Sequence, residues 1–317
     1  MTDTQNEVFK TPVNKIRLFE HGAPGSQNLK LTRKYYTEDM PDGRVKHIVQ
    51  NITDPDIVPY IPDGIGNSTD RQRIPAVLII PGGAFRRLVY NFEGEDVAKW
   101  LNSMGIAAFV LECRLPSDEH DNAEDVPLID AMRAMRVIRG RAQEFSIDEA
   151  KIGVMGFSAG GFMAALLSTA YESDVYADYK YKDEYDKLSA RPDFAVCSYP
   201  VISIDDCIEA GKRYMSEEQV LKRISDSKAK ILHKYNPDKL VRPDMPPVFI
   251  CETDDDRTTL SENSVGFYMA ARKAGVSAEL HIFRTGGHGY GCGDDFAQTG
   301  EWKVLFTKWI KSIGIIS

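Results

Sequence analysis

The chain has 317 residues, of which 43% are hydrophobic and 10% aromatic. This is enough apolar material for one large α/β core or two smaller domains, and we expect one domain over residues 1–317 with insertions. The net charge of -8 and the pI of about 5.4 argue against nucleic-acid or anionic-membrane partners, which need a concentrated basic face. A neutral or polar small molecule is a better partner, and the size fits a monomer or a homo-oligomer.

Cysteine usage and the start of the chain indicate the compartment. The five cysteines are odd in number, widely spaced and never in CxxC spacing, so we expect reduced thiols, no disulfide and no zinc site. They are Cys113, Cys197, Cys207, Cys251 and Cys292. Residues 1–7 are polar and acidic, and no stretch approaches the roughly 20 apolar residues of a membrane span. We expect a cytoplasmic protein, although a chain whose signal peptide has been removed would look the same.

From about residue 76 onward, short apolar runs alternate with longer helical patterns. This alternation predicts an α/β fold, with a mostly parallel central sheet flanked by helices. The predicted strands cover residues 76–80, 106–111, 151–156, 194–199, 247–251 and 278–283. The predicted helices cover residues 91–104, 124–144, 261–274 and 296–313, and one more begins at Ser158.

The first 73 residues have a different pattern. Two alternating stretches, 29–36 and 45–52, predict an antiparallel edge of the sheet. Residues 54–73 are rich in proline and glycine and predict a surface loop.

Two later segments interrupt the α/β pattern. Residues 171–193 are rich in Tyr, Asp and Lys without sustained periodicity, and residues 203–240 are charged and helix-prone. Long insertions late in such a sheet often lie over the substrate site, beyond the carboxyl ends of the strands. We therefore expect both to be lid or pocket insertions.

The pentapeptide Gly156-Phe157-Ser158-Ala159-Gly160 has the form G-x-S-x-G. The pattern alone is weak, but here it stands between a predicted buried strand and an Ala-rich helix, which a nucleophile elbow requires. Such a turn exposes a serine hydroxyl above the sheet, next to the N-H groups of a helix N-terminus. Ser158 is therefore the candidate nucleophile; the alternative is an ordinary glycine-rich turn between strand and helix.

A nucleophilic serine needs a general base, which follows late in the chain in this arrangement. Beyond residue 240 only His281 and His288 are available. His281 lies within a predicted strand, whereas His288 lies in a glycine-rich loop after the last strand, from which an imidazole can reach back over the sheet. We predict that His288 is the base.

The acid that orients the base is expected directly after the strand at 247–251. Asp254, Asp255 and Asp256 stand there, and spacing alone does not separate them. The remaining two would lie in a solvated turn or cap the helix that begins near Ser261.

An oxyanion hole completes this chemistry. One donor is the N-H of Ala159, and a second comes from the loop Pro81-Gly82-Gly83-Ala84-Phe85 after the first parallel strand, at Gly83 or Ala84. The sequence suggests no metal and no cofactor.

Residues 74–315 resemble bacterial acetyl esterases and acetylxylan-esterase-like enzymes of the α/β-hydrolase superfamily. The resemblance is carried by residues 81–85, Glu93-Gly94, residues 97–101, 105–111, 114–116, 127–131 and 152–161, Glu262-Asn263-Ser264 and Gly286-Gly287-His288-Gly289. It implies the α/β-hydrolase fold and the hydrolysis of esters, such as the removal of acetyl groups from sugars or xylan fragments. Counting back from the Glu-Asn-Ser stretch as in these enzymes favours Asp256 as the acid, with Asp255 second.

The chain departs from this family after the first strand. Ala84 and Phe85 stand where a third glycine and an aromatic residue are usual, and Arg86-Arg87 follow where small or apolar residues are usual. Phe85, Arg86 and Phe157 are candidate substrate-binding residues. The alternative for the arginine pair is a surface bridge to Glu93 or Glu95.

Two rival functions remain. A serine peptidase for short peptides would use the same motifs, and an inactive fold could bind small molecules or proteins. The second rival predicts a missing triad member, and none is missing from the sequence.

Overall fold

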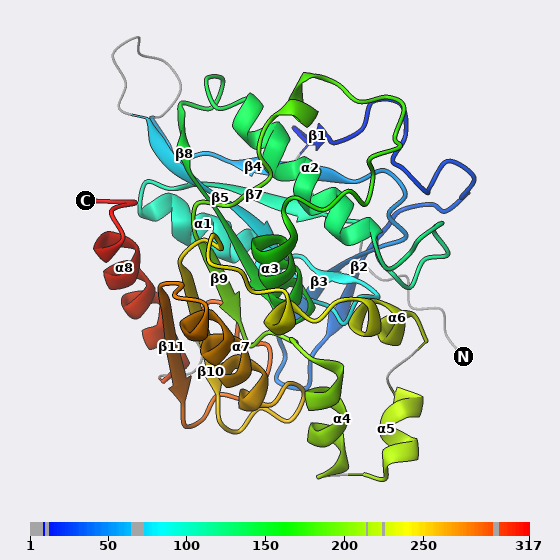
Figure 1. Cartoon of the computed structure of the whole chain (residues 1–317), viewed down its shortest axis with the longest axis vertical. Helices are drawn as coiled ribbons and strands as arrows, with labels where there is room; N and C mark the ends of the chain where they lie inside the picture. Colours follow the sequence, from blue (N-terminus) through cyan, green and yellow to red (C-terminus); the bar gives the residue numbers. More distant parts are fainter. Residues whose placement is uncertain (1–8, 10–12, 65–72, 214, 224–225, 294–297) are drawn as a thin grey trace.

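A mixed sheet runs through the middle of the molecule in the computed structural model (Figure 1). The described parts of the chain, residues 9, 13–64, 73–213, 215–223, 226–293 and 298–317, form an eight-stranded sheet and a smaller three-stranded one. The larger sheet has the order β1 (Ile16–Arg17), β4 (Asp56–Tyr60), β7 (Ala107–Glu112), β5 (Ile74–Ile80), β8 (Ile147–Phe157), β9 (Ala195–Ser198), β10 (Val248–Thr253) and β11 (Ala278–Phe283). Its strands from β7 to β11 are parallel, which confirms the predicted α/β fold.

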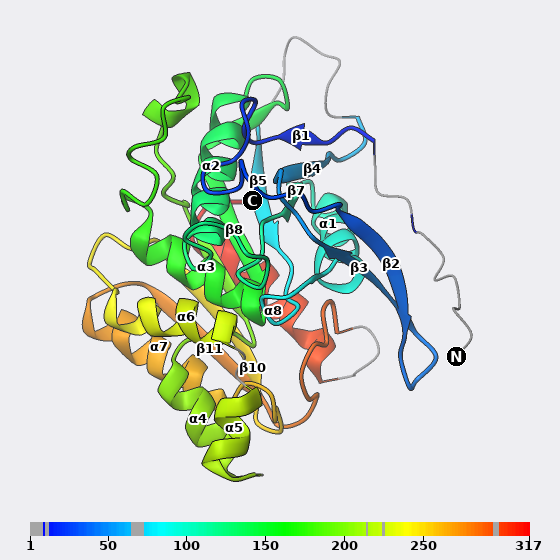
Figure 2. The ribbon, with the colours of Figure 1, turned by 90° about the vertical axis from the view of Figure 1, so that its right-hand side faces the viewer.

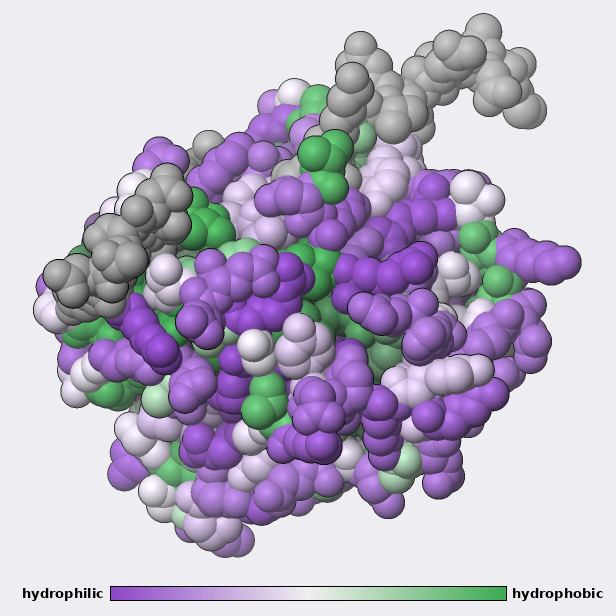
Figure 3. All heavy atoms as spheres, turned by 90° about the horizontal axis from the view of Figure 1, so that it is seen from above, coloured by the Kyte–Doolittle hydropathy of each residue, from purple (hydrophilic) through white to green (hydrophobic). Residues whose placement is uncertain are grey.

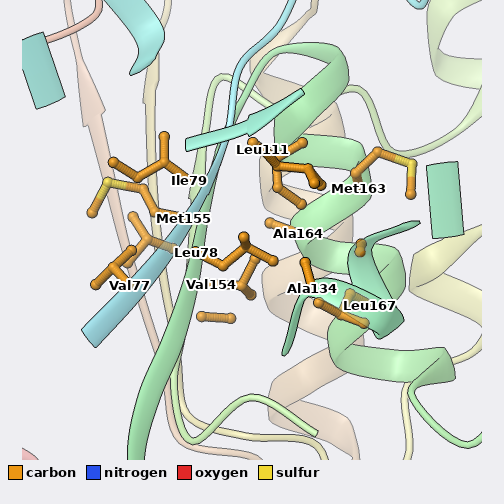
Figure 4. Packing of buried hydrophobic residues seen from close by; sticks show 14 of the residues in the cluster. Val77, Leu78, Ile79, Leu111, Ala134, Val154, Met155, Met163, Ala164 and Leu167 are labelled. Atoms are coloured by element: carbon orange, nitrogen blue, oxygen red, sulfur yellow. The ribbon is translucent and has the colours of Figure 1, made fainter. Parts of the chain in front are cut away.

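Continuous apolar sequence explains why β5 and β8 are central. Val77, Leu78 and Ile79 of β5 and Val154 and Met155 of β8 are completely buried, since helices cover both faces of the sheet (Figure 4). In the paired register, Ile80 stands opposite Gly156, so that the loops after β5 and β8 leave the sheet side by side. The chain turns to opposite sides of β5 to form β7 and β8, and ligand sites of α/β sheets lie at such a switch point.

Helices form a layer on each face of the sheet (Figure 2). On one face, α1 (Asp96–Ser103) and α8 (Trp302–Ser312) meet through the rings of Trp100 and Trp302, 4.9 Å apart. The 3-10 turn Thr299–Glu301 leads into α8. On the other face lie α2 (Val126–Gly140), α3 (Ala159–Ala170) and α7 (Ser261–Lys273).

The N-terminal part differs from the prediction. Of the first alternating stretch only residues 34–36 lie in a strand, β2 (Lys34–Asp39), which pairs antiparallel with β3 (Val45–Gln50) of the second stretch. Together with β6 (Leu88–Val89) they form the small sheet. The antiparallel edge of the main sheet is made by β1 and β4. Strand β4 lies inside the range predicted as a surface loop. Its residues Ile57 and Val58 are completely buried between β1 and β7, so this segment is part of the sheet.

The segment 171–193 lies along α2, and the 3-10 turn Glu184–Lys187 is its regular element. Three arginines of α2, spaced three residues apart, bind this segment. Arg133 binds the carboxylates of Asp183 and Asp186, and Arg136 donates to the carbonyl oxygen of Leu188. Arg139 donates to the carbonyl oxygens of Ser189 and Arg191. In both ribbon views the segment is at the amino ends of the parallel strands, an end whose surface is mostly hydrophilic (Figure 3). This position does not fit the expectation that the segment forms part of a lid.

The segment 203–240 lies elsewhere. It contains α4 (Ile204–Lys212), α5 (Glu217–Arg223), α6 (Asp226–Lys234) and the 3-10 turn Pro237–Lys239. Helices α4 and α5 lie beyond the carboxyl ends of the strands (Figure 1). Among the described residues, no helix combines the length and the apolar character that crossing a membrane requires.

Candidate active site

Ser158 lies at the sharp turn between β8 and α3. Its backbone has φ 53° and ψ -117°, a conformation that costs a residue with a side chain of order 1–3 kcal/mol and occurs mainly at functional sites. The flanking glycines make this turn possible. A Cβ atom on Gly156 would lie 1.9 Å from the carbonyl oxygen of Gly160, and one on Gly160 would lie 2.0 Å from that of Ile80.

His288 reaches Ser158 from the loop after β11. The Nε2 atom of His288 lies 2.8 Å from Oγ of Ser158, within hydrogen-bond distance for proton transfer. The other late histidine, His281, is 2.7 Å from Oε1 of Glu279 on its own strand. The structure therefore brings His288, and not His281, to the serine.

Asp256 is the aspartate that contacts the imidazole. Its Oδ2 atom lies 2.6 Å from Nδ1 of His288, and its side chain is almost completely buried. Its Oδ1 atom accepts the N-H groups of Thr258 and Thr259 at 2.7 and 3.0 Å, and the hydroxyl of Thr259 donates to Oδ2 at 3.0 Å. These donors hold the carboxylate in one orientation toward the ring.

The neighbouring aspartates have other surroundings. Oδ1 of Asp255 accepts the N-H of Gly287 at 2.8 Å and so holds the loop directly before His288, while Asp254 is exposed. Helix α7 begins after Leu260 without a side-chain cap, so neither aspartate caps it.

A further carboxyl group, Glu252, is buried behind Asp256. Burial raises its pKa well above the usual range, and the negative charge of Asp256 raises it further. Its Oε1 atom accepts the N-H of Thr253 at 2.9 Å, and the hydroxyl of Ser264 donates to Oε2 at 3.2 Å. The raised pKa favours a neutral Glu252, which avoids two adjacent negative charges behind the imidazole.

The loop after β5 passes next to Ser158. The N-H of Gly82 is already used, because it donates to Oε2 of Glu93 at 2.8 Å. Gly83 has φ 138°, and Ala84 and Phe85 have φ 60° and 61°, so the loop turns sharply over three residues. The first N-H groups of a helix have no acceptor within the helix, and Ala159 is the first residue of α3.

A pocket lies between this loop and α3. Gly82, Ala159 and Gly160 line it next to the serine, and Phe85 and Met163 contribute apolar surface. The apolar part of this lining suits an apolar group of the substrate.

The three candidate substrate-binding residues have different positions. Phe85 lines the pocket and packs edge-on against Phe162, with ring centroids 5.5 Å apart, and Arg86 is exposed. The side chain of Phe157 is completely buried and packs against the rings of Tyr199 and Trp302. Phe157 is therefore a core residue and not a substrate-binding residue.

The alternative prediction, an ion pair of Arg86 or Arg87 with Glu93 or Glu95, is wrong for Arg87. Arg87 pairs with Glu38 on β2, with 2.5 Å between Nη1 and Oε1, and not with Glu93 or Glu95. Glu95 pairs with Lys99 one helical turn later. Glu93 is buried and bound to the loop after β5.

Three residues around the triad were missed by the sequence analysis: Glu93, Tyr199 and Thr259. Glu93 was noted as part of the family resemblance and as an alternative partner of the arginine pair, without a role at the triad. Tyr199 follows β9 as Ser158 follows β8, and that common position at the carboxyl ends of adjacent strands is the signal that could have identified it.

Comparison with known sequences places the chain in a family. Residues 65–270 match the model of the family described as BD-FAE. The chain is 31% identical over 240 residues to an acetylxylan esterase of Xylanibacter ruminicola, covering 75% of this chain and 45% of that protein. It is 31% identical over 227 residues to endo-1,4-beta-xylanase B of Butyrivibrio fibrisolvens, covering 71% of this chain and 34% of that protein. The chain thus spans less than half the length of both curated relatives.

Solved structures give the same fold. An acetyl ester-xyloside bifunctional hydrolase from Caldicellulosiruptor lactoaceticus is 37% identical, with a TM-score of 0.68 over 83% of this chain and 90% of that one. The carboxylesterase Cest-2923 from Lactobacillus plantarum, 19% identical, shares the fold with a TM-score of 0.68 over 90% of this chain and 99% of that one. The expected resemblance to acetylxylan-esterase-like proteins is confirmed. Since the family model matches most of its length, the chain belongs to the BD-FAE family and has the α/β-hydrolase fold.

Proposed function

We propose that the chain is a serine carboxylic-ester hydrolase that removes acetyl groups from small esters, such as acetylated sugars or xylo-oligosaccharides. The observation that carries this proposal is the continuous hydrogen-bonded series from Ser158 through His288 to Asp256, with distances of 2.8 and 2.6 Å. The apolar surface of Phe85 and Met163 in the pocket beside Ala159 supports an apolar acyl group such as acetyl. The acetylxylan esterase and the acetyl ester-xyloside hydrolase among the similar proteins support an acetylated sugar.

The residues divide the reaction in the following way. Oγ of Ser158 attacks the ester carbonyl carbon while Nε2 of His288 removes the hydroxyl proton, and Asp256 orients the ring and stabilises the imidazolium. The N-H groups of Ala159 and of Gly83 or Ala84 bind the oxyanion. Gly82 is not among these donors, because its N-H is bound to Glu93.

Collapse of the tetrahedral intermediate breaks the bond to the alcohol, which leaves with the proton from His288. The acyl group is then bonded to Ser158. A water molecule attacks this acyl-enzyme while His288 removes one of its protons. Collapse of the second tetrahedral intermediate breaks the bond to Oγ of Ser158, which takes the proton back from His288, and acetic acid leaves and ionises to acetate. Every proton taken up by the imidazole is returned within the cycle, so no cofactor is needed for the balance.

We further propose that residues 203–240 form the outer wall of the substrate site. Helices α4 and α5 lie beyond the carboxyl ends of the strands, where the substrate must enter (Figure 1). The start of this segment is held by α7, since Oδ1 of Asn263 accepts the N-H groups of Ile202 and Ser203 at 2.8 and 3.1 Å.

The test is the variant Ser158→Ala, assayed on a short-chain aryl ester and by labelling with a fluorophosphonate. We expect loss of turnover by a factor of at least about 10⁴, loss of labelling and an unchanged circular dichroism spectrum. Retained turnover would contradict the proposal. A panel of acetylated xylo-oligosaccharides, longer acyl esters and aminoacyl amides then defines the substrate, and preference for the amides would indicate a peptidase instead.

A further inference from the structure

Glu93 is a buried carboxylate that the proposed reaction does not use. It lies in the π-helical turn Asn91–Glu95 before α1, and only 4% of its surface is exposed. Single π-helical turns are rare and occur often at functional sites. Burying a carboxylate costs free energy unless hydrogen-bond donors surround it, so the donors that contact Glu93 indicate its role.

One carboxylate oxygen of Glu93 holds the loop after β5. Its Oε2 atom accepts the N-H of Gly82 at 2.8 Å, directly before the proposed oxyanion donors Gly83 and Ala84. The contact is tight: a Cβ atom on Gly82 would lie 2.7 Å from this oxygen and 3.0 Å from Cβ of Ser158. Glu93 therefore holds the loop where it passes close to the serine.

The other carboxylate oxygen reaches the base through Tyr199. The hydroxyl of Tyr199 donates to Oε1 of Glu93 at 2.9 Å and accepts the N-H of Gly291 at 3.1 Å. The ring of Tyr199 lies against the imidazole of His288, with centroids 5.0 Å apart in an edge-to-face arrangement. Tyr199 also has φ 38°, an unfavourable conformation that these contacts maintain.

We propose that Glu93 is a positioning residue of this hydrolase, which holds the oxyanion loop through Gly82 and the imidazole through Tyr199, and adds a second negative charge that stabilises the imidazolium. This inference rests on the proposed function.

The hydrogen bonds of Glu93 fit a carboxylate. Both described partners donate to it, so its oxygens act as acceptors. The pKa of Glu93 is raised by burial, which outweighs the opposing effects of the charge of His288, the hydroxyl of Tyr199 and the N-H of Gly82, with a smaller opposing contribution from Lys46 on β3. The carboxylate form is therefore inferred from the two donated hydrogen bonds and not from the pKa. The groups facing His288 are Ser158, Asp256, Thr259 and Tyr199.

The sign of the expected pH effect follows from the charge. Activity requires a neutral His288, so kcat/KM falls at low pH. A nearby negative charge favours the imidazolium over the neutral ring. Removing the charge must therefore move the acid limb of the pH profile to lower pH and weaken the imidazolium in the transition state.

The experiment compares Glu93→Gln with Glu95→Gln in the full chain, using a short-chain aryl acetate. Glu95 lies in the same turn and pairs with Lys99 at the surface, so it is a matched control. For Glu93→Gln we expect kcat to fall roughly 10- to 100-fold, KM to change little, and the acid limb to move down by about half a pH unit or more. Glu95→Gln should match the parent in all three quantities.

Tyr199→Phe is the second variant, which keeps the ring on His288 and removes the hydroxyl between Glu93 and Gly291. We expect a smaller fall in kcat and a smaller shift of the acid limb in the same direction. If Glu93→Gln does not fold, Tyr199→Phe decides by the same criteria.

An acid limb that stays at the parent pH in a folded variant would overturn the inference, because a merely structural residue would change the melting temperature and not the pH profile. The Ser158→Ala variant separates a failure of the proposed function from a failure of the proposed role of Glu93. If it retains turnover, the proposed function fails; if it is inactive while Glu93→Gln has the parent pH profile, only the role of Glu93 fails.

Discussion

Asp255 and Asp256 are adjacent in the chain but serve different parts of the site. Asp256 contacts the imidazole, whereas Asp255 binds the backbone of the loop that carries it. An Asn in place of Asp256 can no longer favour the required tautomer of His288. An Asn in place of Asp255 still offers an oxygen to the N-H of Gly287.

We therefore predict that Asp256→Asn lowers kcat on an aryl acetate by about 10³- to 10⁴-fold with little change in the fold. Asp255→Asn is the matched control, with an expected loss of roughly 10-fold or less, since one hydrogen bond is weakened. Steady-state kinetics with circular dichroism as the folding check would measure both. Equal losses in the two variants would contradict the assignment of Asp256 as the acid.

The elbow between β8 and α3 depends on close backbone contact. For Gly160→Ala we expect destabilisation of about 3 kcal/mol or more, because its Cβ would lie 2.0 Å from the carbonyl oxygen of Ile80. Gly266→Ala in α7 is the opposite control. No atom lies within 4 Å of its added Cβ, and Ala should stabilise the helix by roughly 0.5–1 kcal/mol. Urea unfolding measures both, and a neutral Gly160→Ala would refute the steric argument.

The attachment of α4 to α7 is testable with substrates of different size. Asn263→Ala removes the acceptor for two backbone N-H groups, and we expect KM for an acetylated xylo-oligosaccharide to rise roughly threefold or more, since the wall segment loosens. KM for a small aryl acetate should change less. Glu262→Ala breaks the exposed pair with Arg213 between the same segments and should have little effect, because surface ion pairs contribute about 0–1 kcal/mol. An equal rise for both substrates would argue against a wall function for residues 203–240.

The elements that sequence reasoning located share one property, a local pattern. Residues 76–80 are continuously apolar, and the elbow motif stands between a strand and a helix, so both could be predicted without knowledge of the fold. Strand β4 was missed because its five residues contain Pro59 and became a strand only between β1 and β7. The position of residues 171–193 depends on Arg133, Arg136 and Arg139 of α2. The sequence of the segment itself does not indicate these partners.

The same limit applies to the site. Ser158 and His288 could be proposed from motif and chain order. The contacts of Glu93 could not, because they span 11 residues to Gly82 and 106 residues to Tyr199. The order of the strands brings these residues together, so their spacing along the sequence does not predict the network.

Buried His120 makes the stability of the whole molecule depend on pH. Its Nδ1 atom lies 3.0 Å from the hydroxyl of Ser26. Burial, with a smaller contribution from Arg114, lowers the pKa of His120 to about 4. The unfolded chain, with an ordinary histidine pKa near 6.5, binds this proton more readily, so the contribution of His120 to stability is lost as the pH falls from about 6.5 to about 4.

We predict that His120→Gln reduces the loss of unfolding free energy between pH 7 and pH 4 by roughly 2 kcal/mol. Urea unfolding at several pH values measures the slope, which is independent of any uniform destabilisation by the variant. Asp118, whose pKa burial raises to about 6, acts with the opposite sign in both proteins and cancels in the comparison. Exposed His233 provides the control, since His233→Gln should keep the parent slope. The same slope in His120→Gln would disprove the prediction.

The order of the strands also has a consequence for the chain during synthesis. Ser158 and His288 are 130 residues apart, and the strands β9, β10 and β11 lie between them in the sequence. A nascent chain that has released its elbow but not its last loop contains a serine without a base. The proposed activity therefore begins only when the residues up to the loop after β11 have left the ribosome and the strands from β5 to β11 have paired, so hydrolysis itself reports that this part of the sheet has formed.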